Sequence, residues 1–220
     1  MIRAGRGFGK TRSGSEWIHD RVARYGARRI ALVGRSAADV RDVMVEGPTG
    51  IMPTAPPDFH PIFEPTKRRI TWPNGAVATT FTAEEPSLLR GPEHDTAWCD
   101  ELSSWTDAHK GDRLDTAYNN LMLGLRSAHI PPRCLITTTP KSNRLTREIS
   151  NRPSTVLTLG STFENIQNLA DAFREEVIHS YEGTRIGRQE LMGELLDDTE
   201  GALFALSQIE ACRGQLVGAA

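Results

Sequence analysis

The sequence predicts an α/β fold in which helices flank a central, mostly parallel sheet. Short apolar runs rich in β-branched residues alternate with segments of helical periodicity, and this order is typical of parallel sheets. The 220 residues, of which 38% are hydrophobic, suffice for one large domain with a core, or for one domain with a small appendage. We expect a small helical lid at the C-terminal end of this fold.

The strands are expected where short apolar runs are bounded by charged residues, glycine or proline. The pair Asn74-Gly75 lies between two such runs and predicts a hairpin. We expect strands at 28–34, 68–72, 76–81, 96–100, 134–139 and 155–162, the last of them as a central strand.

The helices are expected where apolar residues recur at helical spacing. Ser36 is a candidate N-cap for one of them. Six prolines between 47 and 65 predict an irregular segment. We expect helices at 11–25, 36–45, 169–181 and 185–196.

The charge is small overall and unevenly distributed. A net charge of −2 argues against histone-like DNA binding. Residues 1–35 nevertheless hold nine basic and two acidic residues, whereas 189–210 hold six acidic residues and no basic ones. An anion is therefore expected near the first segment.

Other classes of protein fit the composition poorly. No apolar run approaches the roughly 20 residues of a membrane span, and the first residues show no secretory signal. The three cysteines, Cys99, Cys134 and Cys212, form no CxxC pair. We therefore expect neither a disulfide framework nor a zinc site, and we expect a reducing cytosol.

Residues 4–11, AGRGFGKT, match the pattern GxxxxGK[ST] except that Ala4 replaces the first glycine. In such a loop, glycines let backbone N–H groups converge on phosphate oxygens at the N-terminus of a helix. Lys10 would reach the β- and γ-phosphates, and the Thr11 hydroxyl would hold Mg²⁺. The predicted nucleotide-binding residues are Gly5, Arg6, Gly7, Phe8, Gly9, Lys10 and Thr11.

Two considerations weigh against this interpretation of the loop. A glycine-rich turn that happens to precede a helix is the simpler alternative. A phosphate loop should also follow a β-strand, and only Met1, Ile2 and Arg3 precede Ala4. The sequence thus suggests that the strand is missing or that a partner supplies it. Loss of that strand would expose two sheet edges and lower the free energy of unfolding by several kcal/mol.

An acidic pair, Asp100-Glu101, follows the apolar run 96–99. At the C-terminal edge of a sheet the first acid can orient Mg²⁺ and the second can polarise an attacking water. Most such pairs only cap helices or face solvent. Downstream of a phosphate loop, however, the pair favours nucleotide hydrolysis, with Asp100 at the metal and Glu101 as the catalytic residue.

Several segments in order resemble the ATPase half of the large terminase subunits of tailed bacteriophages. They are GRGFGKTRSGSEW (5–17), RIALVGRSAADVRDVMVEG (29–47), RRITWPNGAVATTFTAEEPSLLRGPEHDTAWCDEL (68–102), CLITTTPKSN (134–143) and YEGTRIGRQELMGELLDD (181–198). The resemblance covers about residues 4–205. It implies a P-loop NTPase of the ASCE, RecA-like type that uses ATP and Mg²⁺.

The resemblance also implies a function and a set of partners. An ATP-hydrolysing motor subunit would drive viral double-stranded DNA into a procapsid, without sequence preference. It would act in a homo-oligomeric ring with the portal protein and the small terminase subunit, and without a membrane. The expected location is the host bacterial cytoplasm, with transient attachment at the portal vertex.

The resemblance assigns roles to residues that spacing alone leaves open. Thr137, Thr138 and Thr139 are similar to the family's coupling motif, although they are equally consistent with ordinary strand residues. Arg90 corresponds to an arginine finger that acts on the adjacent subunit, although a surface arginine in a Gly-Pro turn is the alternative. Arg6 is similar to the family's catalytic loop arginine. Candidate contacts to the DNA backbone are Lys141, Arg144, Arg147 and Arg152, although a solvated helix face is the default interpretation of this cluster.

The resemblance also divides the chain. We expect an ATPase core at 1–165, a helical lid or linker at 166–205 and a tail at 206–220. The acidic residues after 198 are too few for a nuclease site, so we expect no nuclease domain. Two alternatives remain at this stage. One is a truncated remnant that binds nucleotide weakly or not at all, and the other is a different RecA-like motor such as a helicase.

Overall fold

The computed structural model describes residues 1–106, 116–141, 143–181 and 184–195. Its centre is a sheet of eight strands in the order β3-β4-β5-β2-β6-β7-β1-β8. The strands are β1 (Ile2–Ala4), β2 (Arg29–Gly34), β3 (Ile62–Glu64), β4 (Arg69–Thr71), β5 (Val77–Thr82), β6 (Thr96–Asp100), β7 (Arg133–Thr138) and β8 (Thr158–Gly160).

Six neighbouring strands, from β5 to β8 in the sheet order, run parallel, and only β3 and β4 join them in antiparallel fashion. The mostly parallel sheet predicted from the sequence is confirmed. Because all six parallel strands end at the same edge, the residues that follow them meet there. This edge carries the phosphate loop and the acidic pair.

The expectation of a missing first strand is wrong. Residues Ile2–Ala4 form β1, which lies between β7 and β8 and pairs in parallel with both. The amino group of Met1 also donates to the Val156 carbonyl at 2.7 Å. Three residues suffice because neighbours on both sides fill the hydrogen-bonding positions of β1. The two exposed sheet edges expected from its loss do not occur.

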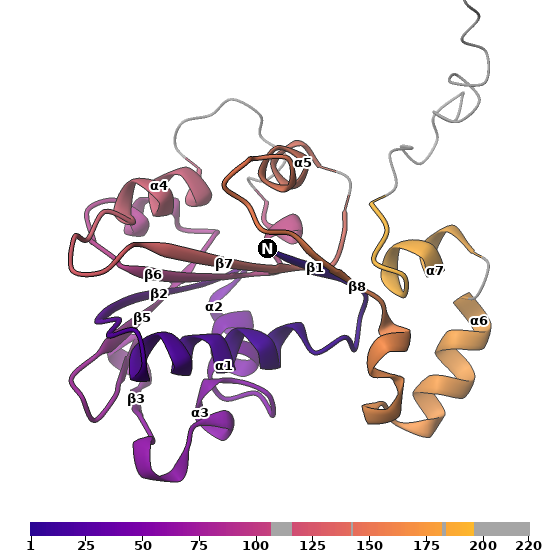
Figure 1. The fold of residues 1–220 in the computed structure, drawn as a ribbon, viewed down its shortest axis with the longest axis horizontal. Coiled ribbons are helices and arrows are strands. Elements are labelled where there is room, and N and C mark those ends of the chain that lie inside the picture. Colours follow the sequence, from indigo (N-terminus) through magenta and orange to yellow (C-terminus); the bar gives the residue numbers. More distant parts are fainter. Residues whose placement is uncertain (107–115, 142, 182–183, 196–220) are drawn as a thin grey trace, which may run out of the picture.

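Helices cover both faces of the sheet (Figure 1). On one face lie α1 (Lys10–Ala23) and α3 (Ile51–Thr54), and on the other lie α4 (Ala117–Gly124) and α5 (Arg144–Ser150). Ser36 caps α2 (Ala37–Asp39) as predicted, and the helix continues as a wider π-helical turn over Val40–Val45. None of the helices in the described ranges is long and apolar enough to span a membrane.

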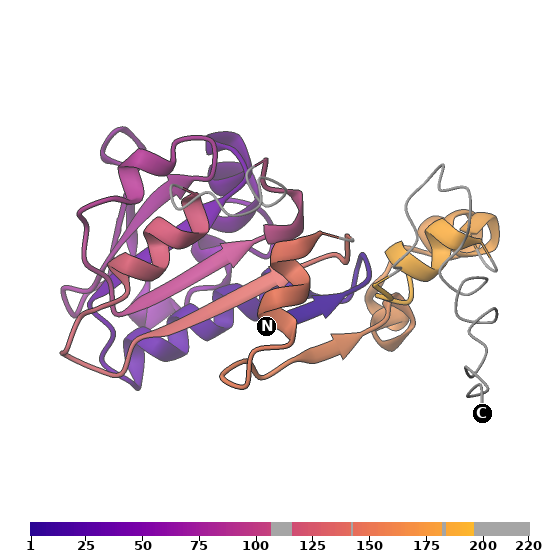
Figure 2. The same ribbon diagram turned by 90° about the horizontal axis from the view of Figure 1, so that it is seen from above.

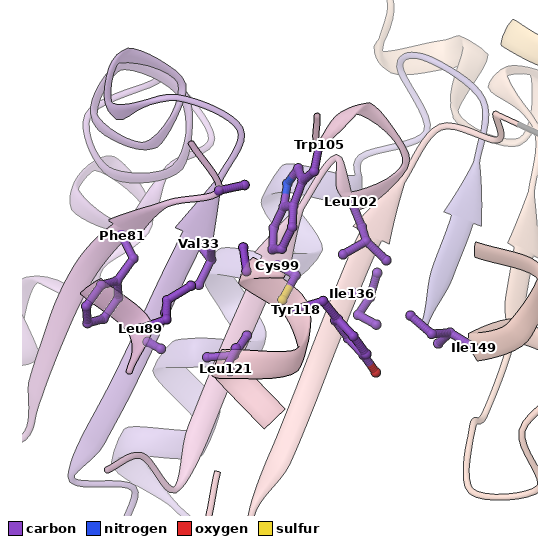
Figure 3. Close-up of a cluster of buried hydrophobic side chains, with 14 residues drawn as sticks. Val33, Phe81, Leu89, Cys99, Leu102, Trp105, Tyr118, Leu121, Ile136 and Ile149 are labelled. Carbon is purple, nitrogen blue, oxygen red and sulfur yellow. The ribbon is translucent and has the colours of Figure 1, made fainter. Parts of the chain in front are cut away.

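The hydrophobic core consists of two clusters, one on each face of the sheet. Successive residues of β2 alternate between them: Leu32 belongs to the cluster beneath α1, and Val33 belongs to the cluster beneath α4. The second cluster, shown in Figure 3, also contains Leu89, Cys99 and Trp105. Because the central strands are buried on both faces, they appear in the sequence as continuous apolar runs.

The segment between 47 and 65 is less irregular than predicted. Besides α3 it contains a 3-10 turn at Pro57–Phe59 and the edge strand β3. The predicted hairpin is confirmed: β4 and β5 pair in antiparallel fashion, and Gly75 adopts a positive φ of 83° in the turn between them. Only glycine adopts this conformation without strain.

The segments after β8 form a helical lid next to the sheet (Figure 2). It comprises a 3-10 segment at Thr162–Asn168, a π-helical segment at Phe173–Ile178, α6 (His179–Tyr181) and α7 (Arg185–Glu190). The strand expected at 155–162 is shorter than predicted and lies at the edge of the sheet, not at its centre. Part of the predicted lid and the whole predicted tail, 206–220, lie outside the described residues.

Candidate functional site

The phosphate loop connects β1 to α1, as a strand–loop–helix unit requires. Gly7 and Gly9 have positive φ angles of 74° and 100°, and Gly9 is the N-cap of α1. These conformations favour glycine and let the backbone turn sharply into the helix. The loop therefore presents its N–H groups and a helix N-terminus at the same place, where a phosphate can bind.

Lys10 is buried at the start of α1, with only 7% of its surface exposed. Its Nζ donates to the carbonyls of Ala4 and Gly5 and to Thr139 Oγ1, each at 3.0 Å. Burial lowers the pKa of Lys10, and the nearby Glu101 carboxylate opposes that shift. The ammonium group is thus held over the loop by three acceptors.

Asp100 lies at the end of β6 and is almost fully buried. The Thr137 hydroxyl donates to its Oδ1 at 2.6 Å and accepts from Trp98 Nε1 at 2.7 Å. Burial raises the pKa of the Asp100 carboxyl to about 6, although the Thr137 hydrogen bond opposes the rise. The chain Trp98–Thr137–Asp100 fixes this carboxylate at the C-terminal edge of the sheet.

Glu101 turns away from the strand direction with a left-handed φ of 47°. Its Oε2 accepts from the Thr139 backbone N–H and its Oε1 from the Thr139 hydroxyl, both at 3.0 Å. Lys10 Nζ lies 3.7 Å from the same Oε1. A non-glycine residue in this conformation is uncommon, and here it directs the carboxylate towards the phosphate loop.

The third threonine of the segment, Thr138, points to a different set of partners. Its hydroxyl donates to Ser103 Oγ at 2.7 Å, and the Ser103 hydroxyl donates to the Thr139 carbonyl at 2.6 Å. Asn143 donates to the Ser103 carbonyl at 3.2 Å, and its Oδ1 caps α5 by accepting from the Thr146 N–H at 2.8 Å. Hydrogen bonds thus connect the threonine segment to the first turn of α5.

A cleft of about 1170 Å³ brings most of the predicted residues together. Its walls come from the phosphate loop, the acidic pair, Thr139 and the lid. The predicted residues that line it are Arg6, Gly7, Phe8, Gly9, Lys10, Thr11, Asp100, Glu101 and Thr139. Gly5, Thr137 and Thr138 lie behind this surface and hold its members in place.

Arg90 is the predicted site residue that the structure does not bring to the cleft. It is exposed at the end of the short turn Pro86–Leu89, whose last residue packs into the core. Its side chain has no hydrogen-bond or ion-pair partner within the described part of the chain. The four candidate DNA contacts are exposed as well, and one of them, Lys141, lines the cleft. Arg144 pairs with Glu148 at 2.6 Å, and Arg152 stacks on Tyr118.

The lid contacts the phosphate loop directly. Arg6 Nε lies 2.8 Å from Glu190 Oε2, and the Arg6 N–H donates to the Glu190 carbonyl at 2.7 Å. The lid also donates to two carbonyls of the loop: the Thr162 hydroxyl donates to the Arg6 carbonyl and Asn165 Nδ2 to the Gly7 carbonyl, both at 2.6 Å. The hydrogen bond to Glu190 raises the pKa of the Arg6 guanidinium.

The cleft residues beside the acidic pair Asp100-Glu101 fit a magnesium ion. The Asp100 carboxylate and the Thr11 hydroxyl both line the cleft. Hard oxygen ligands of this kind bind Mg²⁺ when waters and phosphate oxygens complete the octahedron. Within the described ranges no three His, Cys, Asp or Glu side chains gather as a metal site. A site with one carboxylate and one hydroxyl needs no such cluster.

A family model described as "Terminase large subunit, T4likevirus-type, N-terminal" matches residues 1–211. The chain belongs to this family. No curated protein matches the terminase chain. Membership of this family confirms the resemblance to large terminase subunits that the order of the motifs indicated.

Solved structures share the fold of this terminase chain. A variant of the large terminase ATPase domain of a Thermus phage is 13% identical, with a TM-score of 0.63 over 89% of this chain and 88% of that domain. The large terminase of a thermophilic bacteriophage is 10% identical, with a TM-score of 0.71 over 89% of this chain. The bacteriophage Phi-29 viral genome packaging motor assembly is 16% identical, with a TM-score of 0.54 over 86% of this chain and 62% of that one.

These likenesses establish the fold, which is the P-loop ASCE fold expected from the sequence. The chain spans 88% of the isolated Thermus phage domain but 48% of the whole large terminase from the thermophilic bacteriophage. That second protein has also been solved in complex with ADP, and this complex is 12% identical to the terminase chain with a TM-score of 0.66.

Sequence reasoning missed the residues that reach the site from a distance. Glu190 and Asn165 come from the lid and Ser103 from the turn after β6. Glu190 lies in the segment 181–198 that resembles terminases, but no pattern in the sequence assigned a contact to any of the three. Asn143 carried a usable signal, because an asparagine directly before a helical segment is a typical N-cap. The contacts of the other three depend on how the lid and the sheet edge come together.

Proposed function

We propose that this chain is an ATP-hydrolysing motor subunit that drives viral double-stranded DNA into a procapsid. The observation that carries the proposal is the convergence of Lys10 and Glu101 on Thr139 at the mouth of the phosphate loop. A cation for phosphate and a carboxylate for water then lie at one place. The ADP-bound relative and the Phi-29 packaging motor assembly support this choice.

The proposed binding roles follow from the geometry. The N–H groups of Gly7 to Thr11 would surround the phosphates, because those of Gly5 and Arg6 already donate to the carbonyls of Gly160 and Glu190. Lys10 would exchange one of its three acceptors for a phosphate oxygen. Thr11 and Asp100 hold Mg²⁺, which neutralises charge on the β- and γ-phosphates when it is bound. Because Asp100 is buried and held by Thr137, its carboxylate needs no reorganisation to receive the ion.

The proposed catalytic role of Glu101 is to orient and polarise the attacking water. Thr139 holds both oxygens of its carboxylate, so the side chain is already placed at the edge of the cleft. A carboxylate in this position accepts a hydrogen bond or a proton from the water as it attacks. Arg6 would add positive charge near the γ-phosphate, and Arg90 would act as a finger on the adjacent subunit.

The proposed coupling role belongs to Thr137, Thr138 and Thr139. Thr139 contacts Lys10 and Glu101, and Thr138 reaches the N-cap of α5 through Ser103. A change in the contacts of Lys10 on loss of the γ-phosphate would therefore be felt at α5. The basic residues Arg144 and Arg147 lie on this helix, where DNA-backbone contacts are proposed.

The proposed assembly is a homo-oligomeric ring that works with the portal protein and the small terminase subunit. It would act in the host bacterial cytoplasm and attach transiently to the portal vertex. Exposure of Arg90 is compatible with a role at a neighbouring subunit. The presence of β1 between β7 and β8 removes the reason for regarding the chain as an inactive remnant.

Mg²⁺-dependent ATP hydrolysis by the purified chain tests this function. We expect Lys10→Ala and Glu101→Gln to abolish turnover. Lys67→Ala and Glu85→Gln make the same changes of side chain at exposed ion pairs outside the cleft, and these variants should retain it. Equal rates in Glu101→Gln and in the parent protein would refute the catalytic assignment.

A further inference from the structure

Within the described part of the chain, the cationic side chains that line the cleft are Arg6, Lys10, Arg12, Arg35 and Lys141. Four of them already lie between 2.5 and 3.7 Å from a carboxylate oxygen, in the pairs Arg6–Glu190, Lys10–Glu101, Arg12–Glu16 and Arg35–Asp39. Lys141 is exposed and has neither an ion-pair nor a hydrogen-bond partner among the described residues. Its charge can therefore meet an anion without the loss of an existing pair.

Lys141 lies close to the place where hydrolysis is proposed. It follows Thr139 by two residues, so the Cα atoms of the two lie within about 7 Å of each other. Thr139 holds both oxygens of the Glu101 carboxylate, and all three residues line the cleft. Because Glu101 is proposed to direct water at the terminal phosphate, Lys141 belongs to the γ-phosphate end of the cleft.

The chain on either side of Lys141 is attached to the turn after β6. The Ser103 hydroxyl donates to the Thr139 carbonyl at 2.6 Å, and Asn143 Nδ2 donates to the Ser103 carbonyl at 3.2 Å. Thr139 and Asn143 are both buried, and Pro140 fixes the backbone φ of the residue between Thr139 and Lys141. The exposed side chain of Lys141 therefore starts from a backbone that is anchored before and after it.

The other basic residues near α5 have a different location. Arg144 and Arg147 lie on this helix and Arg152 follows it, and none of these three side chains lines the cleft in the described structure. Lys141 precedes the helix and is the member of the cluster that reaches the cleft. Its place thus favours a contact with the nucleotide, whereas the other three remain candidates for the DNA backbone.

We propose that Lys141 binds the terminal phosphate of a nucleoside triphosphate and makes the cleft prefer a triphosphate to a diphosphate. An ammonium group forms charge-assisted hydrogen bonds with phosphate oxygens. A diphosphate lacks the γ-phosphate, so it offers Lys141 no comparable partner. The inference rests on the proposed function, because it places the terminal phosphate beside Glu101.

The test is the affinity of the full chain for the non-hydrolysable triphosphate analogue AMP-PNP and for ADP, each with Mg²⁺, measured by isothermal titration calorimetry. Lys141→Met keeps a long flexible side chain and removes the charge. Its Kd for AMP-PNP should rise about five- to twentyfold, a range between that of an exposed ion pair and that of a charged hydrogen bond. Its Kd for ADP should change less than about twofold.

Two further variants separate this contact from other effects of the charge. Lys141→Arg retains a positive charge and should restore most of the preference for AMP-PNP. Lys67→Met makes the same exchange at an exposed ion pair outside the cleft, and both Kd values should stay unchanged. A general loss of positive charge would instead weaken AMP-PNP binding equally in Lys67→Met and Lys141→Met, which would overturn the inference.

DNA binding distinguishes the proposed contact from a contact with the DNA backbone. The affinity of Lys141→Met for double-stranded DNA of random sequence, measured by fluorescence anisotropy at several salt concentrations, should equal that of the parent chain. A DNA contact would weaken binding and reduce the salt slope by about 1. That result, together with an unchanged preference for AMP-PNP, would assign Lys141 to DNA and overturn the inference.

The nucleotide measurements also separate the inference from the proposed function. If the parent chain binds AMP-PNP and Lys141→Met binds it equally well, only the inference fails. It also fails if Lys141→Met loses affinity for AMP-PNP and ADP to the same extent, because the contact would then be with phosphates that both ligands share. If the parent chain binds neither ligand, the proposed function fails as well.

Discussion

Thr137 is the residue on which the geometry of the acidic edge depends most. Its hydroxyl serves both Trp98 Nε1 and Asp100 Oδ1 in a fully buried position. Thr137→Val keeps the shape of the side chain and leaves these two groups without that partner. We expect a loss of about 1–3 kcal/mol in the free energy of unfolding, measured by urea denaturation, together with slower ATP hydrolysis.

Thr158→Val is the matched control, because Thr158 lies exposed on the edge strand β8. The same exchange there should change the unfolding free energy by less than about 0.5 kcal/mol. If Thr137→Val and Thr158→Val changed the free energy of unfolding equally, the Thr137 hydroxyl would not be what holds the acidic edge.

The buried side chain of His94 leads to a prediction of how the free energy of unfolding depends on pH. Its ring is 4% exposed, lies edge-on to Phe81, and its Nε2 has no partner among the described residues. Burial lowers the pKa of His94 to about 4, against its usual 6.5. On acidification the unfolded chain therefore takes up the proton first, and stability falls as pH drops from 6.5 towards 4.

The variant His94→Phe removes this titration and keeps a ring beside Phe81. The decrease in unfolding free energy between pH 6.5 and 4 should be smaller in the variant by up to about 3 kcal/mol. Urea denaturation at several pH values measures the difference. Parallel curves for the two proteins would rule out a buried neutral histidine.

Among the elements, α1 approaches the sheet closely at a small residue, Gly14. Gly14 faces the buried Trp98 ring on β6, and a Cβ at this position would overlap that ring. Alanine usually stabilises a helix by about 1 kcal/mol relative to glycine. Here we expect the opposite, a loss of about 1–3 kcal/mol, because the core must shift to accept the methyl group.

Thermal unfolding followed by circular dichroism measures the effect of Gly14→Ala. Ser13→Ala raises helix propensity at the neighbouring position, which lines the cleft, and should leave stability nearly unaltered. A more stable Gly14→Ala variant would show that α1 does not pack closely on β6.

The elements also show which features a sequence can predict. The phosphate loop, the acidic pair and the central strands are local patterns, and the structure contains them where they were expected. Strand β1 has only three residues, too few for any periodicity, and becomes a strand because β7 and β8 pair with it. The edge position of β8 is likewise a property of the assembled sheet, since its own apolar run resembles a central strand.

At the scale of the whole molecule, contacts between distant segments were beyond sequence patterns. Glu190 reaches Arg6 only after the lid has folded against β8, and nothing around position 190 indicates a partner in the phosphate loop. The left-handed backbone of Glu101 was equally hidden, although it directs the carboxylate towards Thr139. The chemistry of the site was predictable from residue types, whereas its supporting contacts were not.

The proposed ring makes a prediction about Arg90. Arg90→Ala and Glu101→Gln subunits should each be inactive alone, since a finger contributes about 10³–10⁵ in rate. In a mixture, an Arg90→Ala subunit retains Glu101 and can receive Arg90 from a Glu101→Gln neighbour. ATP hydrolysis by the mixture should therefore exceed that of either variant. A mixture without this gain would exclude action across the interface.

The central claim is that Glu101 activates water for an ATP molecule bound at the phosphate loop. Its most direct test is single-turnover hydrolysis of Mg²⁺–ATP, with binding measured separately, in Glu101→Gln and in the parent chain. We predict similar ATP affinity and a hydrolysis rate lower by about 10²–10⁴ in the variant, as expected when a general base is lost. An unchanged rate at saturating ATP would contradict the claim.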